Sequence, residues 1–364
     1  MRVRIATIAA GLVAAVAAPS AVAAGDPVLP LAEVRPGMEC RALSVVRATT
    51  PTEFDIEVID VVRGDSPAYG ARILFRASGP AIATTGIGQG FSGSPIYCPD
   101  GRGGEAVIGA ISEGIGQCGN DVALATPIEQ ILGVRPLAPP TARKATALLR
   151  SARPLAAPLT IAGLSAPVRR AALAGAGAAG FPLLAAPAGP ATPYAPYDPL
   201  PGTSIAAAMA TGDLTLAAIG TVSYRDGDAI WAFGHELGAG GRRSLPLLDA
   251  YVYTVIGNPL GSVELTTYKL ASAGRTIGTL DRDGLSAIAG RLGPAPAGIP
   301  VTVRARDRVS GRRTTLRTEV ADERSVGLGS QLGTVAGFAA AEATASVLRA
   351  APPRPTTRLC VRVA

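Results

Sequence analysis

Glycine and proline interrupt this chain throughout, and this limits the elements that it can form. Its 364 residues include 44 Gly and 31 Pro. Between such breaks, the first half contains short runs rich in Val and Ile that partly alternate in polarity, which is typical of strands. We therefore expect residues 25–135 to form a mainly β lobe, with strands near residues 43–46, 54–62, 73–76 and 106–111.

Strand-like patterning returns after a stretch of different composition. Residues 136–200 are dominated by Pro and Ala, which predicts a linker. Residues 201–350 again contain short β-branched runs and end in an Ala-rich segment that predicts a helix over residues 335–349. The sequence thus predicts a mainly β fold of two lobes with a few short helices, followed by a tail at 351–364.

The first 24 residues are typical of a signal peptide. Arg2 and Arg4 precede an apolar run at 5–18, and small residues at 21–23 suit cleavage after Ala23 or Ala24. No later stretch approaches about 18 uninterrupted apolar residues. We expect an exported protein, secreted or held in the bacterial periplasm or cell envelope, with no stable membrane span after cleavage.

One short segment places a serine between glycines. It reads Thr-Thr-Gly-Ile-Gly-Gln-Gly-Phe-Ser-Gly-Ser-Pro-Ile-Tyr over residues 84–97. A serine nucleophile needs an available hydroxyl, converging backbone N–H groups and little side-chain bulk nearby. Gly90 and Gly93 permit such a backbone around Ser92. The alternative interpretation is a glycine-rich hairpin turn whose hydroxyls cap backbone groups.

The order Gly-x-Ser-Gly-Ser-Pro resembles the nucleophile loop of chymotrypsin-like serine proteases. The resemblance implies that Ser92 is the nucleophile and that the N–H groups of Gly90 and Ser92 form the oxyanion hole. The α/β-hydrolase pattern Gly-x-Ser-x-Gly fits less well, because position 94 is Ser and the following residues are strand-like.

The chain contains one histidine, His235, in the segment Trp-Ala-Phe-Gly-His-Glu-Leu-Gly at 231–238. A serine hydroxyl needs a base whose pKa lies near the working pH, and imidazole supplies one. If a histidine activates Ser92, that histidine is His235. The alternative is a structural histidine that is hydrogen-bonded at the end of a strand.

Together these segments resemble the S55 peptidases, the family of the sporulation protease SpoIVB. The matching stretches are residues 85–96, 107–110, 125–129, where Thr126 would cap a helix, 220–222 and 232–235. The resemblance implies a chymotrypsin-like double β-barrel and limited cleavage of a protein or peptide substrate, without a cofactor.

Three departures from that family limit the resemblance. The histidine segment follows the serine segment here, as in a circular permutation, and the PDZ domain has no counterpart. The acidic residue expected before the serine is also missing, since residues 76–79 read Arg-Ala-Ser-Gly. Asp249, Asp281 and Asp283 are candidates for the third triad member only because they lie in the same lobe as His235.

Four cysteines in an exported chain favour disulfides, and four allow three pairings. One of these pairings would join Cys98 to Cys118 around the hairpin after Ser92, and Cys40 to Cys360, which would tie the two ends of the chain together. No Cys-x-x-Cys or Cys/His cluster occurs, so no metal site is expected.

The net charge of +7 does not by itself indicate a nucleic-acid partner. Only Lys144 and Lys269 are lysines among 34 basic residues, and the arginines are scattered along the sequence without clustered aromatics. Two hypotheses remain: an exported serine endopeptidase that uses Ser92 and His235, or a catalytically inactive extracytoplasmic binding or scaffold module of the same fold.

Overall fold

The computed structural model describes residues 25–64, 70–115, 121–155, 159–178, 183–185, 193–238, 240–257, 267–329, 331–348, 358 and 360. The expected signal peptide, Cys118 and most of the expected tail lie outside these residues. The described chain is mainly β, as predicted, with few helices. None of its helices is long and apolar enough to cross a membrane.

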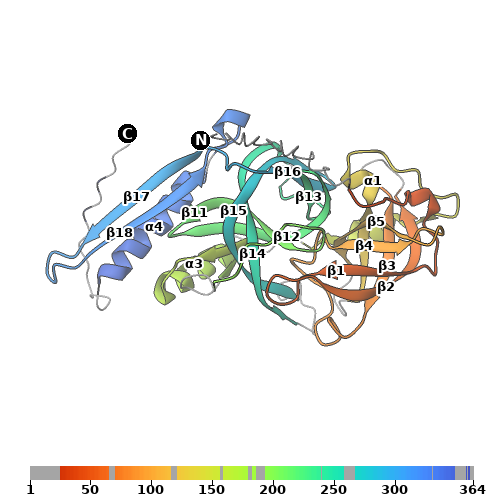
Figure 1. The fold of residues 1–364 in the computed structure, drawn as a ribbon. Coiled ribbons are helices and arrows are strands. Elements are labelled where there is room, and N and C mark those ends of the chain that lie inside the picture. Colours follow the sequence, from red (N-terminus) through yellow and green to blue (C-terminus); the bar gives the residue numbers. More distant parts are fainter. Residues whose placement is uncertain are drawn as a thin grey trace, which may run out of the picture.

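The first lobe is a closed antiparallel barrel of six strands (Figure 1). The strands pair in the order β1-β4-β5-β6-β3-β2, and β2 pairs again with β1. In β2, Phe54, Ile56 and Val58 alternate with exposed residues and fill the interior, as a period of two requires. The strands are β1 (Glu39–Ser44), β2 (Thr52–Arg63), β3 (Arg72–Ser78), β4 (Pro95–Pro99), β5 (Glu105–Gly114) and β6 (Val122–Pro127), with β7 (Arg143–Lys144) and β8 (Arg153–Pro154) added beside β2 and β5.

The second lobe is built on a sheet of ten strands in the order β10-β9-β12-β13-β16-β15-β14-β11-β18-β17. An additional pairing between β11 and β12 closes six of these strands into a circuit. The strands are β9 (Leu159–Ala162), β10 (Leu183–Ala185), β11 (Ser204–Gly212), β12 (Thr215–Asp226), β13 (Ala229–Ala232), β14 (Gly241–Ile256), β15 (Tyr268–Gly284), β16 (Ala287–Leu292), β17 (Gly298–Arg306) and β18 (Arg313–Ala321).

Helices occupy the margins of this β-structure. They are α1 (Ile128–Ile131), α2 (Thr146–Ser151), α3 (Ala166–Ala178) and α4 (Leu332–Val347), with 3-10 turns at Leu31–Glu33 and Arg324–Val326. Thr126 was expected to cap the helix after β6, but it lies within β6, and Pro127 is the N-cap. The stretch 136–200 carries α2, α3 and four short strands, and β9 pairs with β12, so this stretch has more structure than a linker needs.

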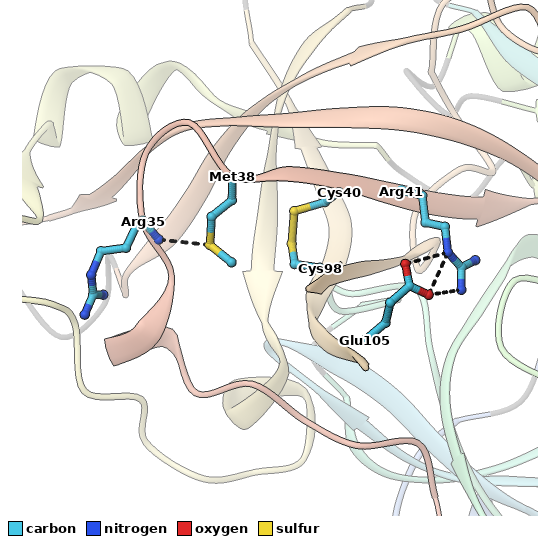
Figure 2. Close-up of a disulfide and its surroundings, with 6 residues drawn as sticks. All are labelled: Arg35, Met38, Cys40, Arg41, Cys98 and Glu105. Atoms are coloured by element: carbon cyan, nitrogen blue, oxygen red, sulfur yellow. Dashed lines mark hydrogen bonds and ion pairs between the residues drawn. A yellow bond between two sulfur atoms is a disulfide. The ribbon is translucent and has the colours of Figure 1, made fainter. Parts of the chain in front are cut away.

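The disulfide joins Cys40 to Cys98, not the expected partners (Figure 2). Strands β1 and β4 are antiparallel neighbours in which Arg41 faces Tyr97, and this register places the two cysteines opposite each other with Cα atoms 4.4 Å apart. Cys360 is free and exposed. The predicted Cys98–Cys118 and Cys40–Cys360 bridges were wrong. They were based on nearness in sequence and on position near the two chain ends, whereas the observed bridge follows from the pairing of β1 with β4.

Replacing both Cys40 and Cys98 by serine should lower the free energy of unfolding by about 4 kcal/mol. The bridge closes a loop with a sequence separation of 58 residues, and this loss reflects the entropy that its closure removes from the unfolded chain. Urea denaturation of the oxidised protein and the double variant measures the difference. Cys360→Ser is the matched control and should change nothing; equal stability of all three proteins would contradict the pairing.

Candidate functional site

The serine segment forms the connection from β3 to β4, and two of its glycines adopt left-handed backbone angles. Gly90 has a φ of 87° and Gly93 a φ of 92°. At position 93 space is also lacking, because a Cβ there would lie 2.0 Å from Thr221 O and 2.5 Å from Phe233 N. Glycine is therefore required on both sides of Ser92, as the sequence predicted.

The loop is held against the second lobe by hydrogen bonds. The N–H of Thr221 on β12 donates to Ser92 O at 3.0 Å, and the N–H of Lys269 on β15 donates to Gln89 O at 3.0 Å. The N–H of Phe233 in turn donates to Thr221 O at 3.2 Å. The structure thus brings the serine segment and the histidine segment together although more than a hundred residues separate them.

The hydroxyl of Ser92 is completely buried and has no hydrogen-bond partner among the described residues. An unpaired buried hydroxyl costs about 1–3 kcal/mol and calls for an explanation. Among the described residues, no group accepts a hydrogen bond from the N–H of Gly90 or of Ser92. The hydroxyl of Ser92 and the N–H groups of Gly90 and Ser92 were assigned from sequence to the nucleophile and the oxyanion hole. None of the three has a hydrogen-bond partner among the described residues.

His235 follows a turn with unusual backbone angles. Phe233 and Gly234 have φ values of 71° and 66°, and Phe233 is completely buried. Positive φ at a bulky residue stores strain and is enriched at functional sites. The hydroxyl of Thr126 donates to Gly234 O at 2.7 Å and fixes this turn against β6 of the first lobe.

The imidazole of His235 is buried and lies between two backbone carbonyls. Its Nδ1 is 2.6 Å from Glu236 O and its Nε2 is 3.3 Å from Leu155 O. Burial lowers the pKa of His235, and the two carbonyls oppose this shift. The ring is therefore neutral at pH 7 and can accept a proton, but no described hydrogen bond joins it to Ser92.

None of the three candidate aspartates contacts the imidazole through a described hydrogen bond. Asp249 accepts from Tyr194 OH at 2.7 Å and pairs with Arg275 at 2.8 Å. Asp283 accepts from the N–H groups that follow His235 and therefore positions that loop. Asp281 is exposed. Across the part of the chain that is described, no group of three His, Cys, Asp or Glu side chains could hold a metal ion.

A buried lysine, Lys269, contacts the serine loop, and the sequence analysis assigned it no function. Lys269 is 0% exposed, and its Nζ lies 2.8 Å from Ser44 Oγ and 3.1 Å from Thr221 Oγ1. It also lies 4.8 Å from the centre of the Phe91 ring. No described carboxylate pairs with the amine, and burial lowers its pKa to about 7.

Lys269 is connected to both sides of Ser92. On one side, Ser94 Oγ donates to Ser44 Oγ at 2.8 Å, and Ser44 contacts the amine. On the other side, Thr221 Oγ1 donates to Gly90 O at 2.9 Å. One feature of the sequence could have pointed to Lys269: it is one of only two lysines in an arginine-rich chain. A lysine loses its charge on burial far more readily than an arginine, so a lysine in such a chain is a candidate for a buried amine.

No protein-family model, curated protein or solved structure matches this chain. The functional argument therefore rests on the residues and contacts described above.

Lys269→Met should remove a pH dependence of stability. The folded-state pKa of Lys269 is about 7 and the unfolded value is near 10.5, so between these values the unfolded chain binds the extra proton. The stability of the wild type relative to the variant should therefore rise with pH from about 7 to 10, by at most ~1.4 kcal/mol per pH unit.

Urea denaturation of both proteins at pH 7 and pH 9 measures this difference. Lys144→Met is the matched control, because Lys144 lies on an exposed strand. If the difference in free energy of unfolding between the wild type and Lys269→Met stays constant from pH 7 to pH 9, the pKa of Lys269 is not lowered by folding.

Proposed function

We propose that this chain is an exported serine endopeptidase with a chymotrypsin-like pair of β-barrels, in which Ser92 is the nucleophile. The observation that carries the proposal is that, among the described residues, neither the buried hydroxyl of Ser92 nor the N–H groups of Gly90 and Ser92 have a hydrogen-bond partner. Left-handed glycines shape this loop, and its hydrogen bonds to the second lobe hold it at the junction of the two lobes. The two closed strand circuits support the double-barrel arrangement.

In the proposed reaction, Ser92 Oγ attacks the carbonyl carbon of a peptide bond. Its proton passes to His235, which is neutral near pH 7, and then to the nitrogen of the leaving amine. The negative charge on the carbonyl oxygen is stabilised by the N–H groups of Gly90 and Ser92. Water then hydrolyses the acyl-enzyme by the same route, and Ser92 regains its proton.

The described conformation is closed and must change before a substrate can react. Ser92 is inaccessible, and Leu155 O lies beside the Nε2 of His235 that would face a nucleophile. Leu155 follows β8 and is held by its own N–H, which donates to Ser112 O at 2.8 Å. Displacing Leu155 would free the Nε2 of His235.

The inactive binding or scaffold module remains the second candidate. It is favoured by the complete burial of Ser92 and by the absence of a described Ser92–His235 hydrogen bond. Labelling with a fluorophosphonate separates the candidates, because this probe reacts only with an activated serine beside a formed oxyanion hole.

Ser92→Ala should abolish the fluorophosphonate adduct, whereas Ser94→Ala should keep most of it. The hydroxyl of Ser94 donates a hydrogen bond to Ser44 and holds the loop, whereas the hydroxyl of Ser92 has no hydrogen-bond partner among the described residues. Mass spectrometry of the labelled mature protein locates the adduct. An adduct on Ser94, or none under conditions that label a control protease, would reject the assignment of Ser92; turnover should fall about a thousandfold or more in Ser92→Ala.

His235→Ala should remove labelling of Ser92 and, because the imidazole is buried between two backbone carbonyls, should also lower the melting temperature, whereas Lys269→Met should leave labelling measurable. Because the pKa of His235 is lowered from 6.5, the wild-type labelling rate should rise with pH below 6.5 and level off above it.

Lys269, whose pKa is lowered to about 7, is the alternative base, and the rate of labelling as a function of pH distinguishes it from His235. A rate that levels off only above pH 7, and a profile that is lost in Lys269→Met but not in His235→Ala, would assign the base to Lys269. Normal labelling of a folded His235→Ala protein would likewise remove His235 from the mechanism.

A further inference from the structure

Strands β17 and β18 form a hairpin that extends from the second lobe at the end of the molecule opposite the first barrel (Figure 1). Helix α4 packs against this hairpin. Val301 and Val303 belong to the same hydrophobic cluster as Phe338 of α4. One face of the hairpin is thereby covered, and the opposite face consists of residues that alternate with these valines.

The uncovered face is strongly basic. Residues that are directly opposite in an antiparallel pair share a face, and here Arg306 faces Arg313, Arg304 faces Thr315 and Thr302 faces Arg317. All four of these arginines are exposed, as are Arg308 and Arg312 at the tip. These six arginines, 304, 306, 308, 312, 313 and 317, are called the basic face below.

Among the described residues, the arginines of the basic face outnumber the acidic groups near them, which are Asp307 beside Arg312 and the exposed Glu319 on the same face as Arg317. None of its six arginines forms a described ion pair; Arg312 only donates a hydrogen bond to Ser346 O at 3.0 Å. The nearby Asp307 accepts from the N–H groups of Val309 and Ser310 and so closes the turn. Because Arg306 and Arg313 are like charges placed directly opposite, the free hairpin carries a repulsion that a bound anion would relieve.

The tip adds an apolar group to this charge. Val309 is 97% exposed and lies between Arg308 and Arg312. A polyphosphate surface with an apolar layer beneath it would contact both kinds of group, since arginine binds phosphates in pairs of hydrogen bonds and valine gains by leaving water. A nucleic acid fits less well, because the basic face has no aromatic side chain for stacking and no Asn or Gln for base edges.

We propose that the basic face docks the protein onto an anionic lipid surface, with the guanidinium groups on headgroup phosphates and Val309 at the boundary of the acyl chains. The hairpin then lies on the membrane while the first barrel, at the other end of the molecule, remains free (Figure 1). This inference does not depend on the proposed peptidase activity.

The test is co-sedimentation of the mature chain with vesicles of phosphatidylcholine alone and of phosphatidylcholine mixed with phosphatidylglycerol. We expect binding only to the anionic vesicles, with a loss at high salt. Arg306→Ser with Arg313→Ser should weaken binding about 25-fold, since each basic residue near such a surface contributes about fivefold. The melting temperature should stay equal or rise, because a like-charge pair is removed.

The matched control is Arg102→Ser with Arg170→Ser, which removes the same charge from exposed positions elsewhere and should bind nearly as the wild type. Val309→Ser should weaken binding without changing its dependence on salt. Three outcomes overturn the proposal: no preference for anionic vesicles, equal losses in the two double variants, or tighter binding to a DNA oligonucleotide than to the vesicles.

Discussion

The close contact between Gly93 and the second lobe determines the arrangement of the site. No atom larger than hydrogen fits at this position, because Thr221 O and Phe233 N occupy the space of a side chain. The contact fixes Ser92 relative to β12, and through Phe233 it fixes the turn that carries His235. Any substitution at position 93 would therefore separate the two segments on which the proposed chemistry depends.

Local patterns in the sequence predicted those parts of the structure that depend on neighbouring residues. The alternation around Phe54 and Ile56 predicted strand β2, and Gly90 and Gly93, which were expected to permit an unusual backbone around Ser92, have positive φ angles. The Cys40–Cys98 bridge was missed because it depends on which strands become neighbours, and no local pattern encodes this. Lys269 was missed for the same reason: its environment is assembled from Ser44, Thr221 and the serine loop.

The basic face shows a related limit of reading charge along a chain. In sequence its six arginines all lie within residues 304–317, but their spacing does not show which of them share a surface. Pairing of β17 with β18 brings them onto one surface, where Arg306 and Arg313 become direct neighbours. The buried amine of Lys269 presents the opposite case, since the fold there isolates one basic group from every described carboxylate and lowers its pKa to about 7.

The dependence of the serine loop on Thr221 and Lys269 has a consequence for biogenesis. A chain that leaves the ribosome or crosses a membrane from its N-terminus presents the first barrel before β12 and β15 exist outside. Until they arrive, the loop lacks the groups that hold Gln89, Gly90 and Ser92 in place. The first half therefore emerges with an incomplete site, and the arrangement around Ser92 forms only after nearly three quarters of the polypeptide has followed.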